Sequence, residues 1–115
     1  METTHAVAAL AALAQESRLD IFRLLIQAGP DGLPAGHIAE RLGLPPPTLS
    51  FHLNQLRQAS LITFQRNGRS LIYAAAFGAM NDLLGFLTQN CCQGDPGACD
   101  IAPTICCPPA RETTP

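Results

Sequence analysis

The 115-residue sequence predicts a mainly helical α+β domain, in which four helices precede a β-hairpin and a fifth helix follows it, in the order ααααββα. Apolar side chains recur at helical spacing as far as residue 58 and again within residues 77–90. Asn67-Gly68, the strongest short hairpin signal, stands between two segments rich in β-forming residues. Periodicity then stops, so residues 1–90 are the predicted domain and residues 91–115 a Cys-rich, flexible tail.

The first two helices are predicted at residues 5–14 and 16–28. Apolar residues at helical spacing in the first helix are Val7, Leu10, Ala11 and Ala14. The second helix has a buried stripe made of Ile21, Phe22, Leu24 and Leu25. Gly29-Pro30 ends this helix, because glycine favours a helix C-terminus and proline cannot continue the helix.

The third helix is predicted from Pro34 to Arg41, with Gly43 ending it. A fourth helix begins at Pro45-Pro46-Pro47, since prolines suit only a helix start, where amide protons lack intrahelical partners. One face of the fourth helix carries Leu49, His52, Leu53 and Leu56. Its place on this stripe predicts that His52 is a packed, hydrogen-bonded core residue rather than a contact to a base.

The hairpin and the last helix complete the domain. Residues 61–65 and 69–75 are the predicted strands, and residues 77–90 the fifth helix. Its apolar stripe consists of Met80, Leu83, Leu84 and Leu87. This face and the Ala-rich first helix offer more apolar surface than so small a body can cover. We therefore expect a homodimer formed through the first and last helices.

Two helices joined by a tight turn with glycine, followed by a basic hairpin, are the order of a winged helix-turn-helix. The formal net charge is −2, but no acidic residue lies between Glu40 and Asp82, a stretch with four arginines. The candidate DNA-binding residues are Thr48, Ser50, Phe51, Asn54, Gln55 and Arg57 in the fourth helix and Arg66 and Arg69 in the hairpin. A small helical domain with a solvated polar helix is the alternative.

The segment LPAGHIAERLGLPPPTLSFHLNQLRQASLI, residues 33–62, resembles the core of ArsR-type metalloregulatory repressors, as do SRLDIFRLL before it and FQRNGRSLIYAA after it. The resemblance covers residues 10–88 and is most specific at PTLSFHL followed by Leu56-Arg57. It implies a homodimer that binds double-stranded operator DNA and releases it when a metal or metalloid binds. The family usually has a polar cap and glutamine where this chain has Pro45 and Pro46. A two-cysteine arsenic site of the family aligns with Pro34 and Gly36, and residues 77–90 lack the histidine of a zinc-type site.

All five cysteines lie in the tail, at Cys91, Cys92, Cys99, Cys106 and Cys107. The cluster contains no histidine, and sulfur ligands alone select soft, thiophilic ions. Some arsenic-responsive relatives carry an adjacent cysteine pair just beyond the last helix and a third cysteine a few residues later. This resemblance implies As(III) as inducer, or the similar Sb(III), held by Cys91, Cys92 and Cys99. Cys106 and Cys107 could replace one of these ligands, bind a second ion or relay the metalloid, or they could be a spare pair.

Three other interpretations of the cysteines remain open: a four-thiolate zinc site, a redox switch, and an inert tail. A thiol-rich metal-binding or metallochaperone protein, whose helical part only dimerises, is the main alternative function. An enzyme is not predicted, because neither a nucleophile–base constellation nor a phosphate-cradling glycine loop occurs. The amino end lacks the features of a secretory signal, and no apolar run approaches the ~18 residues of a membrane span, so we expect a cytoplasmic protein without membrane contact.

Overall fold

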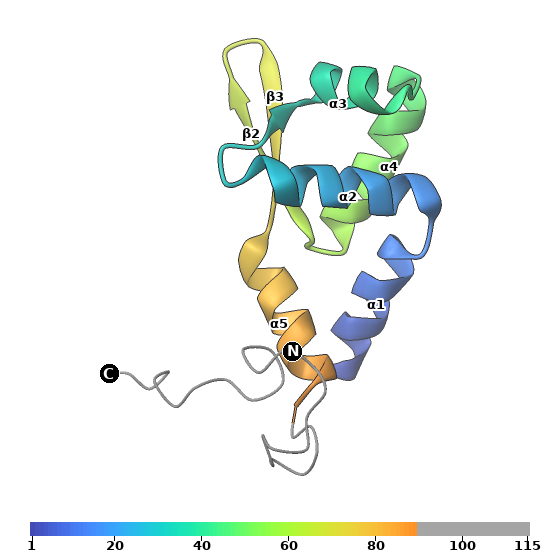
Figure 1. Cartoon of the computed structure of the whole chain (residues 1–115), viewed down its shortest axis with the longest axis vertical. Helices are drawn as coiled ribbons and strands as arrows, with labels where there is room; N and C mark the ends of the chain where they lie inside the picture. The colour runs from blue at the N-terminus through green and yellow to red at the C-terminus, as the bar shows by residue number, and fades with distance from the viewer. Residues whose placement is uncertain (90–115) are drawn as a thin grey trace, which may run out of the picture.

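The computed structural model describes residues 1–89, which form five helices and three short strands. In chain order the elements are α1 Thr3–Leu13, α2 Glu16–Ala28, β1 Leu33–Pro34, α3 Ala35–Leu42, α4 Pro46–Gln58, β2 Ile62–Asn67, β3 Ser70–Ala75 and α5 Phe77–Leu87. In Figure 1, α2 crosses the middle of the molecule, α3 and the tip of the β2–β3 hairpin lie above it, α4 passes behind it, and α1 and α5 lie below. Within the described residues, no helix has the length and apolar character needed to cross a membrane.

The predicted order ααααββα is confirmed, with one strand added and small shifts at the ends of elements. α2 has the predicted bounds, whereas α1 begins and ends slightly earlier than expected. α3 begins at Ala35 because Pro34 is its N-cap, in an extended conformation, rather than its first residue. α5 ends at Leu87, short of the predicted residue 90.

The additional strand is β1, a two-residue segment that pairs with β3 and makes a three-stranded antiparallel sheet in the order β1-β3-β2. Leu33 lies opposite Tyr73 in this pairing. Gly32, just before β1, has a φ of +70°, and a Cβ atom there would overlap the carbonyl oxygen of Tyr73. Glycine therefore allows the chain to approach β3 closely enough to pair.

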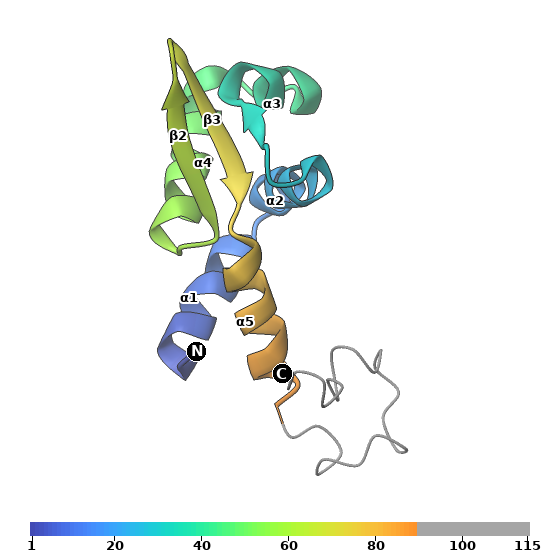
Figure 2. The same cartoon turned by 90° about the vertical axis from the view of Figure 1, so that its left-hand side faces the viewer.

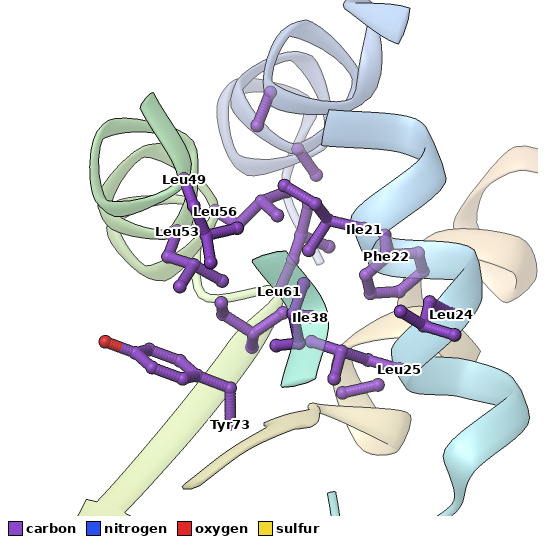
Figure 3. Packing of buried hydrophobic residues seen from close by; sticks show 14 of the residues in the cluster. Ile21, Phe22, Leu24, Leu25, Ile38, Leu49, Leu53, Leu56, Leu61 and Tyr73 are labelled. Carbon is purple, nitrogen blue, oxygen red and sulfur yellow. The ribbon is translucent and has the colours of Figure 1, made fainter. Parts of the chain in front are cut away.

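The core lies between α2 and α4. Figure 3 shows Leu49, Leu53 and Leu56 of α4 facing the α2 side chains, with Ile38 and Leu61 between them. The largest fully buried side chains are Ile21, Leu25, Ile38, Leu56 and Leu61. Burying each such side chain stabilises the fold by roughly 1.5–3 kcal/mol. The apolar stripe of α4 is thus buried as predicted, and its packing fixes which face of the helix meets solvent.

The buried face of α1 differs from the predicted stripe. Ala6, Ala9 and Ala12 pack into the core, whereas Val7 is 58% and Leu10 42% exposed. Since alanine side chains are small, this face lets α1 lie close to its neighbours within the chain. Val7 and Leu10 are left on the surface, whereas Leu13 is half-buried against the core.

Candidate nucleic-acid interface

The turn between α3 and α4 determines how α4 is presented. α3 ends at Gly43, whose φ of +65° is the left-handed conformation that glycine adopts readily. α4 then begins at Pro46, after Pro45 at the N-cap, and no side chain caps this end. Proline lacks an amide proton, so Pro46 and Pro47 leave fewer unsatisfied donors at the helix start than other residues would.

The exposed face of α4 carries the residues predicted to meet bases. Thr48, Ser50, Phe51 and Asn54 are all exposed. Because successive helical residues are rotated by about 100°, Phe51 and Asn54 point away from the buried leucine stripe. The Phe51 side chain is 57% exposed, and its ring meets the His52 ring edge-on at 5.5 Å between centroids. A large apolar ring surrounded by polar side chains suits contact with thymine methyl groups beside hydrogen bonds to base edges.

Gln55 lies apart from this group. It is only half-exposed and lines a hollow of about 440 Å³ between α1 and α4, together with Ala8, Arg18 and Gln58. Its side chain is therefore on the α1 side of the helix, away from the face that presents Asn54. The sequence alone could not show that Gln55 lies away from the exposed residues of α4, because the position of Gln55 relative to solvent depends on where α1 packs.

The hairpin, whose first strand contacts α4, carries two further arginines. Arg66 and Arg69 are exposed: Arg66 lies near the end of β2, and Arg69 lies in the two-residue turn that it forms with Gly68, between the paired residues Asn67 and Ser70. Arg57, in the last turn of α4, has its guanidinium carbon 4.0 Å from the centroid of the Phe64 ring in β2. Arg57 thus links the last turn of α4 to β2, the strand that also carries Arg66.

His52 is a core residue, as its place on the leucine stripe predicted. Its side chain is 8% exposed, and its Nδ1 lies 3.4 Å from Nη1 of Arg18. Burial, followed by the nearby Arg18 charge, lowers the pKa of His52 below 6.5. The Nε–H of Arg18 also donates to the carbonyl oxygen of Ala12 at 2.6 Å. Arg18 therefore ties α1 to α4, a role that sequence reasoning missed because His52 is distant from Arg18 in the chain.

The predicted metal-binding residues, Cys91, Cys92 and Cys99, lie outside the described residues, as do Cys106 and Cys107. Within residues 1–89, no group of three or more His, Cys, Asp or Glu side chains is placed to hold a metal ion. Pro34 and Gly36, at the start of α3, are both exposed.

α3 and α4 with the tight turn between them, followed by the arginine-bearing hairpin, define a winged helix-turn-helix of the kind that binds DNA. Residues 13–63 match a helix-turn-helix domain family. The chain is 32% identical over 63 residues to the transcriptional repressor SdpR of Bacillus subtilis, a match covering 55% of this chain and 70% of SdpR. An ArsR-like transcriptional regulator from Rhodococcus sp. RHA1 has the same fold, with a TM-score of 0.68 and 26% identity over 78% of this chain and 82% of that protein.

The chain belongs to the ArsR family of winged helix-turn-helix, DNA-binding transcriptional regulators, which is not a family of enzymes. It is also 30% identical over 80 residues to the nodulation protein NolR of Rhizobium meliloti, which covers 70% of this chain. The chain spans 63% of the length of NolR.

Proposed function

We propose that this protein is a transcriptional repressor that binds operator DNA as a homodimer and releases it when trivalent arsenic binds cysteines of the tail. The DNA-binding part rests on one observation above all, the exposed face of α4 beside the arginine-bearing hairpin. SdpR is a transcriptional repressor, which supports repression rather than activation.

In the proposed complex α4 enters the major groove. Thr48, Ser50 and Asn54 supply hydrogen-bond donors and acceptors for base edges, and Phe51 lies against thymine methyl groups. Arg66 and Arg69 contact phosphates or reach the minor groove. The stretch between Glu40 and Asp82 adds no carboxylate to repel the phosphates.

The dimer is proposed to form through α1 and α5. Val7 and Leu10 on α1 and Leu87 on α5 are exposed. Figure 2 shows the two helices side by side at the end of the molecule opposite the hairpin. A hollow of about 340 Å³, lined by residues of both helices including His5 and Asp82, lies between them. A second copy would cover these apolar side chains and place the two α4 helices on one face of the dimer. They would then meet two half-sites separated by about one turn of the DNA helix, or by a multiple of one turn.

The inducer is proposed to be arsenite, with antimonite as a related ion. Residues 1–89 contain no cysteine, so a thiolate site must use the cysteines from Cys91 onward. Arsenic(III) is soft and prefers three sulfur ligands, which Cys91, Cys92 and Cys99 can provide. The first two follow α5 closely in the chain, so an ion that joins them to Cys99 can act on the proposed dimer helix. To release DNA, the ion must bind the DNA-incompetent form more tightly.

Fluorescence anisotropy with labelled DNA from upstream of the gene tests both parts of the proposal. The full chain should bind this DNA better than shuffled DNA and release it as sodium arsenite is added. Changing any one of Cys91, Cys92 or Cys99 to Ser should keep binding and weaken release, whereas the Cys106→Ser, Cys107→Ser double variant should change release less.

Each part can fail separately. Equal affinity for upstream and shuffled DNA would reject the operator-binding function and favour a thiol-rich metal-binding protein. Full release by arsenite in the Cys91→Ser, Cys92→Ser variant would reject this trio as the sensor. Release by zinc or by peroxide, but not by arsenite, would replace the proposed inducer with a zinc site or a redox switch. X-ray absorption of the arsenite complex should show three sulfur ligands and no nitrogen.

A further inference from the structure

Arg57 differs from the other candidate DNA-binding arginines because its charge already has a partner within the chain. Its guanidinium carbon lies 4.0 Å from the centre of the Phe64 ring, within the range of a cation–π contact. Within residues 1–89, Arg57 makes no ion pair that would compete with this contact. The aromatic ring of the hairpin is therefore the contact that orients this side chain.

The Phe64 ring also contacts a second aromatic ring, that of Tyr73. Phe64 is paired with Tyr73 across the hairpin, and their rings stack at 5.7 Å between centroids with 26° between their planes. Tyr73 is buried and, on its other side, is paired with Leu33 of β1. A continuous series of contacts thus runs from the three-stranded sheet through the Tyr73 and Phe64 rings to the end of α4.

The two strands of the hairpin differ in burial: β3 is half-buried or buried from Leu71 to Ala75, whereas β2 has few buried contacts that could fix its direction. At the base of the hairpin, the amide of Ala76 donates to the carbonyl oxygen of Leu61 at 2.8 Å, and Ile62 is buried. Every residue of β2 beyond Ile62 is exposed. Because little of this part of the strand is buried, a surface contact such as Arg57 with Phe64 can decide its angle to α4.

We propose that Arg57 is a positioning residue: through the Phe64 ring it fixes the angle of the hairpin to α4, so that Arg66 and Arg69 meet the backbone while α4 meets the bases. Its main role is then to align two DNA-contacting elements rather than to bind a phosphate. The effect on DNA binding rests on the proposed function, whereas the contact between Arg57 and Phe64 is present in the protein without DNA.

The DNA-binding test compares Arg57→Gln with Phe64→Leu, which removes the ring without changing charge. Both variants should weaken binding to upstream DNA by about two- to fivefold, the range of a surface cation–π contact. Combining the changes should weaken binding no further, because both break the same contact. The salt dependence should match the parent in all three variants and decrease only in the control Arg66→Gln. The proposal would be overturned if the salt dependence of Arg57→Gln decreased as much as that of Arg66→Gln while Phe64→Leu bound DNA as tightly as the parent.

A second test uses the full chain without DNA. In Arg57→Gln and Phe64→Leu, ¹⁵N heteronuclear NOE values of the hairpin amides should fall, and Arg57→Lys, which keeps a cation near the ring, should recover part of that decrease. Arg66→Gln should resemble the parent, and thermal melting should show that all variants fold. Parental NOE values in Arg57→Gln would overturn the positioning role whatever the DNA result. If the parent chain binds no DNA, the proposed function fails, while this experiment still decides whether Arg57 orders the hairpin.

Discussion

α4 and the α1–α5 pair both expose large apolar side chains, but in different surroundings. On α4, Phe51 lies among the polar residues Ser50 and Asn54. On α1 and α5, Val7, Leu10 and Leu87 are exposed on helices made largely of apolar residues. The first surface suits base edges, which offer hydrogen-bonding groups and methyl groups together, and the second suits another protein surface. Exposed hydrophobic residues therefore indicate a partner only when their neighbours are considered.

The largest effect should come from a charge on the α5 surface. Leu87→Asp is expected to give monomers and to weaken operator binding by about 100-fold or more, because each monomer keeps only half of the DNA-binding surface. Light scattering and anisotropy measure the two effects. Leu19→Asp, at an exposed leucine of α2, is the matched control and should remain dimeric. A monomeric Leu87→Asp variant that binds DNA with full affinity would show that operator binding does not need a dimer formed through α1 and α5.

A smaller effect is expected on the α4 surface, and it should be selective. Asn54→Ala should lower the discrimination between operator and shuffled DNA by about 1–3 kcal/mol if its amide meets a base. Gln27→Ala, which removes an exposed amide from α2, should leave discrimination unchanged. Competition binding with the two DNA sequences makes the measurement. Equal discrimination in the two variants would mean that Asn54 does not read a base.

The hairpin arginines should affect all DNA sequences alike. Arg66→Ala and Arg69→Ala are each expected to weaken binding to operator and shuffled DNA equally. The salt slope should decrease by about 0.9 for each phosphate that the variant no longer neutralises. Anisotropy titrations at several salt concentrations measure this slope, with the exposed Arg23 of α2 changed to Ala as the control. A sequence-dependent decrease in the affinity of Arg66→Ala would instead indicate that Arg66 meets a base.

The smallest expected effect concerns His52, which connects the two regions through Arg18. The pKa of His52 is lowered in the folded protein, so the unfolded chain binds a proton more readily as the pH falls below about 6.5. The free energy of unfolding should therefore fall as the pH decreases through this range, until the lower folded-state pKa is passed. Urea unfolding between pH 7.5 and 5 should show a smaller fall in the free energy of unfolding for His52→Gln than for the parent. The control His37→Gln should show the same fall as the parent. An equal fall in His52→Gln would mean that another group causes the pH dependence.

Local sequence signals predicted much of the fold. Helical periodicity and terminating glycines placed α2, and Asn67-Gly68 placed the hairpin between β2 and β3, because these signals depend on residues close together in the chain. β1 was missed, since two residues cannot show alternation and Pro34 is unusual in a strand. Its pairing depends on β3, almost forty residues further on. The sequence did not show that Ala6, Ala9 and Ala12 form the face of α1 that packs within the chain, because which face an Ala-rich helix buries depends on its neighbours.

The sequence by itself determined the class of the domain, the exposed residues of α4, the exposed arginines of the hairpin and the buried position of His52. These follow from periodicity and turn chemistry, which are local. Only the tertiary structure decided that Gln55 lies towards α1, that Arg18 joins Ala12 to His52, and that Arg57 rests on the Phe64 ring. Each of these interactions joins elements whose relative placement is set by the packed core, and spacing along one element carries no information about it.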